Sequence, residues 1–175
     1  MDKKALLVID VQNYFINQFT QHIPGQIAAF IEKNKYKFNS IFFFQFINSS
    51  DSNWVKISHW RKMLRSPEID IVPRLRKFLT PDNLFPKTAF SCFKNKRFLK
   101  IIKINNLKNF YLCGLDTHAC VYCTAMDAYE SGFNVYVIKD LCAASHGLSY
   151  HKNSLRALIK NLGGQVIVDS ITKII

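Results

Sequence analysis

The sequence predicts an α/β fold, a three-layer α/β/α sandwich built on a mainly parallel, about six-stranded sheet of Rossmann type. Short apolar runs alternate along the chain with amphipathic stretches of helical length. The runs are apolar throughout rather than at every second residue, which is typical of parallel strands covered by helices on both faces. Glycine or an acidic residue ends several of these segments. This alternation implies right-handed crossovers and places ligands at the carboxyl ends of the strands.

In the first half of the chain, apolar runs predict two strands and an amphipathic stretch predicts one helix. The first run ends at Asp10, which therefore lies at the carboxyl end of its strand. The helix gathers Ile27, Ala28, Phe30 and Ile31 on one side. The expected segments are a strand at residues 4–9, a helix at 24–38, a strand at 40–47, a polar loop at 48–58, amphipathic pieces at 59–79 cut by Pro67 and Pro73, and a turn bracketed by Pro81 and Pro86.

The second half repeats one unit, a helix followed by a strand, and its glycines mark where helices end. Gly132 follows one helical pattern, and Gly163 with Gly164 follows another. Asp140 is expected to stop the strand that precedes it. The expected segments are a helix at residues 95–107, a strand at 109–113, a helix at 118–131, a strand at 134–138, a helix at 151–162 and a last strand at 165–168.

Length and composition predict a single soluble domain over residues 1–175. The chain has 175 residues, 49% of them apolar, with 15 Phe and 7 Tyr, which excludes a disordered chain. No apolar run approaches the roughly 18 residues that cross a bilayer, and the run near the N-terminus is too short for a secretory signal. The five cysteines are an odd number at scattered spacings, so we expect reduced thiols in the cytoplasm and no disulfide.

The formal charge of +12 is concentrated in one part of the chain. Residues 56–108 hold 14 basic residues and 3 acidic ones. Such a surface attracts polyanions or anionic substrates, although a solvated lysine-rich surface is the simpler interpretation. Binding of nucleic acid through the basic 56–108 surface, on a frame without catalytic activity, therefore stays open as a function.

Cys120 is the first candidate for chemistry, because an apolar run ends at Gly114 and a helical pattern begins just beyond Thr117. At a helix N-terminus, the dipole and the free N–H groups stabilise a thiolate and can receive an oxyanion. The alternative is a cysteine that is merely buried. A thioredoxin-like redox pair of Cys120 and Cys123 is disfavoured, because such sites need a later proline facing the cysteines and no proline follows Pro86. A structural zinc site with His118 is also disfavoured, because the sequence has no second pair of ligands at metal-binding spacing.

Three motifs in order carry a resemblance to a known family. They are Asp10-Val-Gln12 at the end of the first strand, the segment from Lys87 to Phe93, and the run from Gly114 to Val121 that contains Cys120. Together with the later Asp140 and His151, they resemble the isochorismatase-like cysteine hydrolases across nearly the whole chain. Each motif is weak alone, but the three together on an alternating frame are quite specific.

The resemblance implies a catalytic triad of Cys120 as nucleophile, Asp10 as general base and Lys87 as the cation. A thiol is mostly protonated at neutral pH, so a carboxylate that takes its proton and an ammonium that favours the thiolate serve separate needs. The resemblance also implies a cis peptide bond between Leu115 and Asp116. That bend would aim the N–H groups of Asp116 and Cys120 at one point as an oxyanion hole, with the Asp116 carboxylate pointing away.

Within the family, the residues favour cleavage of a C–N bond in a small amide or ureide through a thioester. Members that cleave the vinyl ether of isochorismate often lack the cysteine, so this reaction, or another one on the same fold, is the alternative. Nicotinamidase-like members carry a metal on an Asp-x-His pair after the second strand, which residues 48–54 lack, so we expect no metal and no cofactor. The resemblance also implies a homo-oligomer that acts on a small-molecule substrate. The candidate pocket residues are Gln12, Phe15, Trp54, Trp60, Phe90, Phe93 and Thr117.

Overall fold

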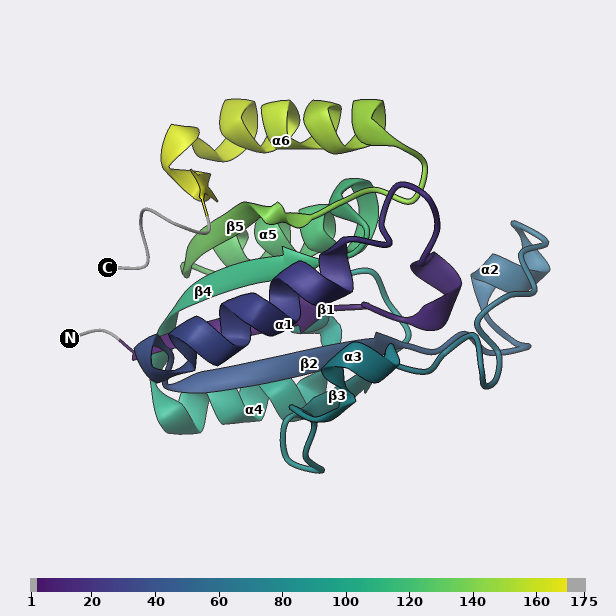
Figure 1. Cartoon of the computed structure of the whole chain (residues 1–175), viewed down its shortest axis with the longest axis horizontal. Coiled ribbons are helices and arrows are strands. Elements are labelled where there is room, and N and C mark those ends of the chain that lie inside the picture. The colour runs from purple at the N-terminus through teal and green to yellow at the C-terminus, as the bar shows by residue number, and fades with distance from the viewer. Residues whose placement is uncertain (1–2, 170–175) are drawn as a thin grey trace.

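The computed structural model, which describes residues 3–169, contains one six-stranded parallel sheet (Figure 1). All five neighbouring strand pairs are parallel, and the strand order is β3-β2-β1-β4-β5-β6. The strands are β1 (Lys3–Ile9), β2 (Ser40–Phe46), β3 (Leu84–Lys87), β4 (Leu107–Gly114), β5 (Asn134–Cys142) and β6 (Ile167–Val168). The predicted parallel sheet is thereby confirmed.

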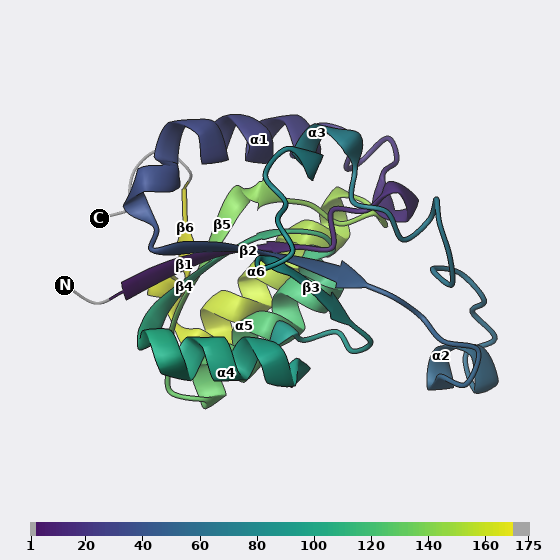
Figure 2. The same cartoon turned by 90° about the horizontal axis from the view of Figure 1, so that it is seen from below.

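Helices cover both faces of the sheet, which gives the three predicted layers. α1 and α3 lie on one face, while α4, α5 and α6 lie on the other (Figure 2). The helices are α1 (Ile23–Asn34), α2 (Asn53–Lys56), α3 (Pro73–Arg76), α4 (Lys96–Asn105), α5 (Tyr122–Glu130) and α6 (Leu148–Leu162). No helix within residues 3–169 is long and apolar enough to cross a membrane.

The core follows from the apolar runs that predict the strands. β1 is central, pairs with β2 and β4, and its residues from Ala5 to Ile9 are at most 1% exposed. On the α4 side, the phenylalanines of the sheet and of the helix form an edge-to-face cluster in which Phe44 and Phe98 have ring centroids 4.9 Å apart. Such pairs stabilise a core beyond the area they bury. The buried centre therefore holds the carboxyl ends of β1 and β4 in fixed positions.

The structure corrects the predicted segments at the strands. β3 lies where the sequence predicts only a turn. The strand was missed because it has only four residues and one of them is Pro86. Proline is tolerated there since β3 is an edge strand that pairs with β2 alone. β5 continues through Asp140 to Cys142 instead of stopping at residue 138. β6 is shorter than expected, because residues 164–166 form a 3-10 turn.

The helices differ from the predicted ones mainly at their ends. α1 stops at Asn34 and a 3-10 turn follows, while α6 begins three residues earlier than the expected 151. The polar loop at residues 48–58 contains the short helix α2, whose first turn is capped by the Ser52 hydroxyl. In Figures 1 and 2, α2 and its flanking loops extend away from the sheet. This segment between β2 and α3, residues 47–72, is called the extension below.

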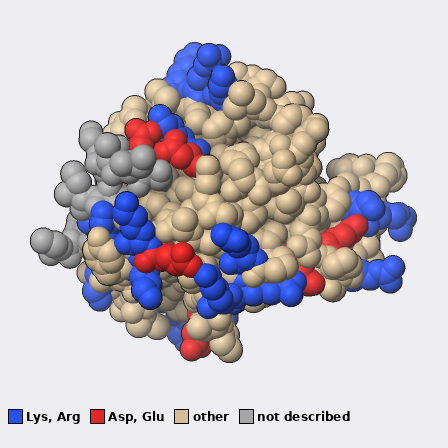
Figure 3. Space-filling view, in the orientation of Figure 1, with Lys and Arg blue, Asp and Glu red and all other residues tan. Residues whose placement is uncertain are grey.

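Basic side chains on the face in Figure 3 occur in separate groups, and acidic side chains accompany several of them. Within residues 56–108, Lys62 pairs with Glu68 and Arg76 lies 3.8 Å from Asp70. Lys87 contributes no surface charge, because its side chain is 1% exposed. The excess of positive charge in this part of the sequence is therefore partly neutralised locally.

Candidate active site

The sheet brings Asp10, Lys87 and Cys120 together at the carboxyl edge of its strands. Asp10 directly follows β1, Lys87 is the last residue of β3, and Cys120 lies in the π-helical turn Thr117–Val121 that leads from β4 into α5. Lys87 Nζ lies 2.6 Å from Asp10 Oδ2 and donates to Cys120 Sγ at 3.4 Å. It also donates to the carbonyl oxygen of Ala89 at 2.9 Å. The ammonium therefore contacts both the carboxylate and the thiol.

Burial dominates the electrostatics of these three groups. It raises the pKa of Asp10, although the charge of Lys87 opposes the rise. Burial also lowers the pKa of Lys87, but the neighbouring Asp10 carboxylate outweighs that effect and the net shift is upward. It raises the pKa of Cys120 well above the ordinary value, and the charge of Asp10 adds to that rise. Burial therefore favours the protonated thiol, whereas the Lys87 ammonium favours the charged form of Asp10.

The turn before the thiol depends on a glycine. Gly114 has φ +116°, and a Cβ at this position would lie 2.1 Å from the carbonyl oxygen of Ile9. Only glycine permits this close approach of β4 to β1. Leu115 then donates its N–H to the Ile9 carbonyl oxygen at 2.8 Å, and the Leu115–Asp116 peptide bond is cis, the geometry that the resemblance implies.

The Asp116 carboxylate is bound to the loop between β5 and α6. Its Oδ1 accepts from the N–H of Ser145 at 2.7 Å, and its Oδ2 accepts from the Ser145 hydroxyl at 2.6 Å. Asp116 nevertheless contributes to the wall of the cavity that contains Cys120. Burial raises the pKa of Asp116, and the hydrogen bonds from Ser145 oppose that rise.

A cavity of about 460 Å³ opens beside the thiol, with walls that are largely aromatic. Four residues predicted for the pocket do line it: Phe15, Trp54, Trp60 and Phe90. Trp54 and Trp60 come from the extension, and the Trp60 indole donates to the Tyr14 hydroxyl at 3.1 Å. The other lining residues are Phe46, Ser58, Asp116, His118, Ala119, Cys120, Cys123 and His146.

The structure places the remaining pocket candidates, Gln12, Phe93 and Thr117, outside this lining. Gln12 is fully buried, and its side-chain amide bonds the N–H and the carbonyl of Phe46 and the carbonyl of Ile69. Phe93 packs in the core, and Thr117 bonds His151 through its hydroxyl. Gln12 therefore joins the end of β1 to β2 and to the extension, because its amide satisfies backbone groups of Phe46 and Ile69.

Sequence reasoning did not select Phe46, His118 or His146 as pocket residues. Phe46 ends β2 in a run of phenylalanines that gives no sign of which one faces the cavity. His146 lies in the loop after β5, a strand that runs four residues farther than predicted. His118 stands two residues after Asp116, and that Asp-x-His spacing was the available signal.

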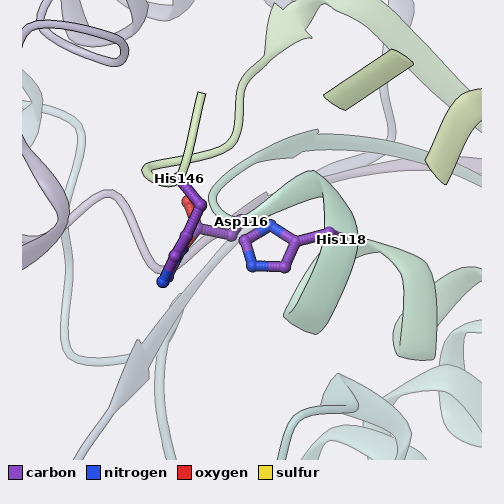
Figure 4. A group of neighbouring side chains, drawn as sticks. All are labelled: Asp116, His118 and His146. Atoms are coloured by element: carbon purple, nitrogen blue, oxygen red, sulfur yellow. The ribbon is translucent and has the colours of Figure 1, made fainter. Parts of the chain in front are cut away.

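Asp116, His118 and His146 form a group with the donor atoms of a metal site. One ligand atom from each lies within 4.8 Å of those of the other two (Figure 4). The loop after β2, where nicotinamidase-like members are expected to hold a metal, has no such pair in residues 48–54. The residues that could bind a cation thus belong to the connection after β4 and the loop after β5.

Comparison with known protein families shows to which family the chain belongs. A model of the family described as "Isochorismatase domain" matches residues 4–169. The chain belongs to the isochorismatase family. It is 30% identical to "Isochorismatase family protein 2A" of Dictyostelium discoideum over 162 residues, which cover 88% of this chain and 72% of that protein. A match to "Isochorismatase domain-containing protein 2" of Xenopus laevis, 33% identical over 60 residues, spans 34% of this chain and 29% of that protein.

Solved structures agree on the isochorismatase fold. An "Isochorismatase-like Hydrolase" from Alkaliphilus metalliredigens superposes with a TM-score of 0.83 at 18% identity, covering 96% of this chain and 95% of the other. "N-carbamoylsarcosine amidase" from Thermoplasma acidophilum gives 0.80 at 21% identity, with 98% of both chains covered. The predicted family and fold are confirmed, and by family the chain is an isochorismatase-like hydrolase.

Proposed function

We propose that this isochorismatase-family chain is a cysteine-dependent hydrolase that cleaves the C–N bond of a small amide or ureide through a thioester on Cys120. The observation that carries the proposal is the position of Lys87 Nζ, 2.6 Å from the Asp10 carboxylate and 3.4 Å from the Cys120 thiol. A buried base, a fixed cation and a thiol at the wall of one cavity are the parts that acyl transfer through sulfur requires.

In the first half-reaction, Asp10 removes the thiol proton as Cys120 Sγ attacks the carbonyl carbon of the substrate. Burial raises the pKa of Cys120 and favours the protonated thiol, so the proton transfer accompanies the attack. The raised pKa of Asp10 makes this carboxylate a stronger base than an exposed one. The oxyanion is received by the N–H groups of Asp116 and Cys120. Protonated Asp10 then gives its proton to the leaving nitrogen as the C–N bond breaks.

In the second half-reaction, water replaces sulfur on the acyl carbon. Asp10, again a carboxylate, takes a proton from a water molecule whose oxygen attacks the thioester. The C–S bond breaks and the proton returns to sulfur, so Asp10, Lys87 and Cys120 end as they began. Lys87 keeps its charge throughout, because its pKa is shifted upward, and it offsets the negative charge that alternates between Asp10 and Cys120.

The walls of the cavity indicate a planar or apolar substrate. Phe15, Phe46 and Phe90 face it together with Trp54 and Trp60. Stacking and edge contacts with such rings favour flat acyl or ureide groups. The structural similarity to a protein named N-carbamoylsarcosine amidase supports the amide class, because an amidase cleaves a C–N bond.

The test is ammonia release from a panel of nicotinamide, maleamate, N-carbamoyl amino acids and ureidoacrylate-like compounds. We expect turnover of one class by the wild type and no turnover by Cys120→Ala. Cys142→Ala is the matched control, since Cys142 is also buried but lies outside the cavity that contains Cys120. Rapid acid quenching and mass spectrometry of the protein should then detect the acyl group on Cys120.

Two outcomes would contradict the proposal. Equal turnover by wild type and Cys120→Ala would exclude the thioester. No turnover, together with a Cys120 that reacts with iodoacetamide no faster than free cysteine, would mean that the thiol is not activated. Steep salt-dependent binding to DNA or RNA would in that case favour the polyanion-binding function.

A further inference from the structure

Asp116, His118 and His146 come from two separate connections of the fold and meet on the cavity wall. Asp116 and His118 belong to the turn that leads into α5, and His146 belongs to the loop between β5 and α6. Figure 4 shows the Asp116 side chain next to His146, with the His118 ring projecting toward them from the helical turn. We propose that these three residues bind a divalent transition-metal cation, in the first instance Zn²⁺, on the wall of the cavity that also contains the Cys120 thiol.

The donor set matches the chemistry of zinc. Two imidazole nitrogens and one carboxylate oxygen are three of the four ligands in a tetrahedral site, and the fourth position is then open to water or to a donor atom of another molecule. The group carries one negative charge when both imidazoles are neutral, so a cation neutralises it. An anion at the same place would meet the Asp116 carboxylate. The charge therefore favours a metal ion over an anionic group of a substrate.

Hydrogen bonds already hold the carboxylate while leaving it able to coordinate. The two bonds from Ser145 occupy one acceptor position on each Asp116 oxygen, and a carboxylate offers about four such positions. Outer partners of this kind orient a ligand before the metal arrives and strengthen its binding. Ser145 thus fixes Asp116 in the position of a preformed ligand.

The histidines have ring nitrogens that the described part of the chain does not satisfy fully. His118 Nδ1 is buried and has no hydrogen-bond partner among the described residues. The His118 and His146 rings lie edge to face with centroids 5.0 Å apart and share no hydrogen bond that would compete with a metal. His146 Nδ1 has a long contact of 3.3 Å with the Ser145 hydroxyl. A buried nitrogen without a partner is costly, and coordination of a metal through His118 Nδ1 would remove that cost.

The group must contract to close around the ion, and one member is free to do so. Ligand atoms in a tetrahedral zinc site are about 3.4 Å apart, so a spread of up to 4.8 Å has to shrink by up to about 1.4 Å. Asp116 is buried and held by Ser145, whereas His146 is exposed on its loop. A change of the His146 rotamer supplies the movement without altering the turn that carries the thiol.

Direct metal binding to the whole chain, without substrate, tests the proposal independently of the proposed hydrolase function. Protein stripped with a chelator is titrated with Co²⁺, whose visible absorption reports coordination number, and Zn²⁺ is then added to displace it. We expect one Co²⁺ per chain with the spectrum of a four- or five-coordinate site. His146→Asn and His118→Asn should each weaken binding at least about 100-fold.

Two further variants separate the proposed ligands from other donors. His59→Asn is the matched control, because His59 is an exposed histidine outside the group and Asn tolerates its positive φ of 54°. Cys120→Ser tests whether the thiol is itself a ligand, and we expect it to keep Co²⁺ binding. The proposal is overturned by a protein that binds no Co²⁺, by affinity that His146→Asn leaves unchanged, or by binding that only Cys120→Ser abolishes. Because His146 is exposed, its variant answers the question even if His118→Asn fails to fold.

Discussion

Replacing Lys87 with methionine isolates the buried ion pair at the centre of the site. Lys87 and Asp10 have side chains that are 1% and 0% exposed, and their charged atoms lie 2.6 Å apart. Methionine keeps much of the length of the lysine stem but removes the ammonium, so Asp10 stays buried without its counter-ion. Loss of one partner from a buried pair costs about 3–5 kcal/mol. We expect Lys87→Met to lose that much unfolding free energy near pH 7.5.

The loss should depend on pH in a definite direction. Burial raises the pKa of Asp10, and without Lys87 the main influence that opposes this rise is gone. A carboxyl whose pKa is higher in the folded chain than in the unfolded chain binds more protons when folded. Its folded state is therefore favoured at low pH and loses stability as the pH rises through the folded pKa. We expect Lys87→Met to recover about 1.4 kcal/mol for each pH unit below that value, until the ordinary Asp pKa of about 3.9 is reached.

Urea denaturation followed by circular dichroism at pH 5, 6.5 and 8 measures both effects. Lys94→Met is the matched control, since Lys94 forms a pair with Asp127 at 3.1 Å in which the side chains are 65% and 25% exposed. A partly exposed pair is worth about 0–1 kcal/mol, so the control should change little. Equal losses in the two variants, or a loss in Lys87→Met that is the same at all three pH values, would refute the assignment of a buried charge to Asp10.

Three further predictions concern the same edge of the sheet. The rate of Cys120 alkylation by iodoacetamide should rise with pH, because burial raises the pKa of both the thiol and the base Asp10. A pH-independent rate would contradict this. Gly114→Ala places a Cβ 2.1 Å from the Ile9 carbonyl oxygen, so we expect more than about 3 kcal/mol of destabilisation or no folded protein. Thermal melting measures this, and a melting temperature equal to that of the wild type would refute the prediction. Gln12→Met leaves the buried N–H and carbonyl of Phe46 without their partner, so we expect it to cost about 2–4 kcal/mol in urea denaturation. A cost below about 1 kcal/mol would mean that water replaces the amide.

The order of strands and helices could be predicted because the apolar runs are nearly uninterrupted and are separated by clear helix ends. The positions of Asp10 and Cys120 follow from that order, since Asp10 directly follows the apolar part of β1 and Cys120 lies in the turn after β4. Lys87 was selected through its motif, but the strand that carries it was missed. A four-residue edge strand with an internal proline has the composition of a turn, and only pairing with β2 makes it a strand.

The wall of the cavity was less predictable, because it depends on the direction of side chains and on loops. Gln12 follows a strand end just as Asp10 does, yet its amide turns inward to Phe46 while Asp10 turns to Lys87. Phe93 and Phe90 occur in the same short segment, but only Phe90 reaches the cavity. His146 follows β5, which runs on to Cys142. No local pattern in the sequence indicates that this strand continues so far.

The position of Lys87 at the end of β3 also determines how the candidate site can come apart without global unfolding. β3 has a neighbour on one side only, so its hydrogen bonds can open while the five other strands stay paired. Such an opening would withdraw the ammonium from Asp10 and Cys120 and leave the rest of the molecule folded. The free energy of this local opening, rather than that of global unfolding, then sets the fraction of molecules in which the ion pair is intact. Amide hydrogen exchange in β3 measures this opening free energy directly. We expect it to be lower than the free energy of global unfolding, under conditions where the helices remain intact.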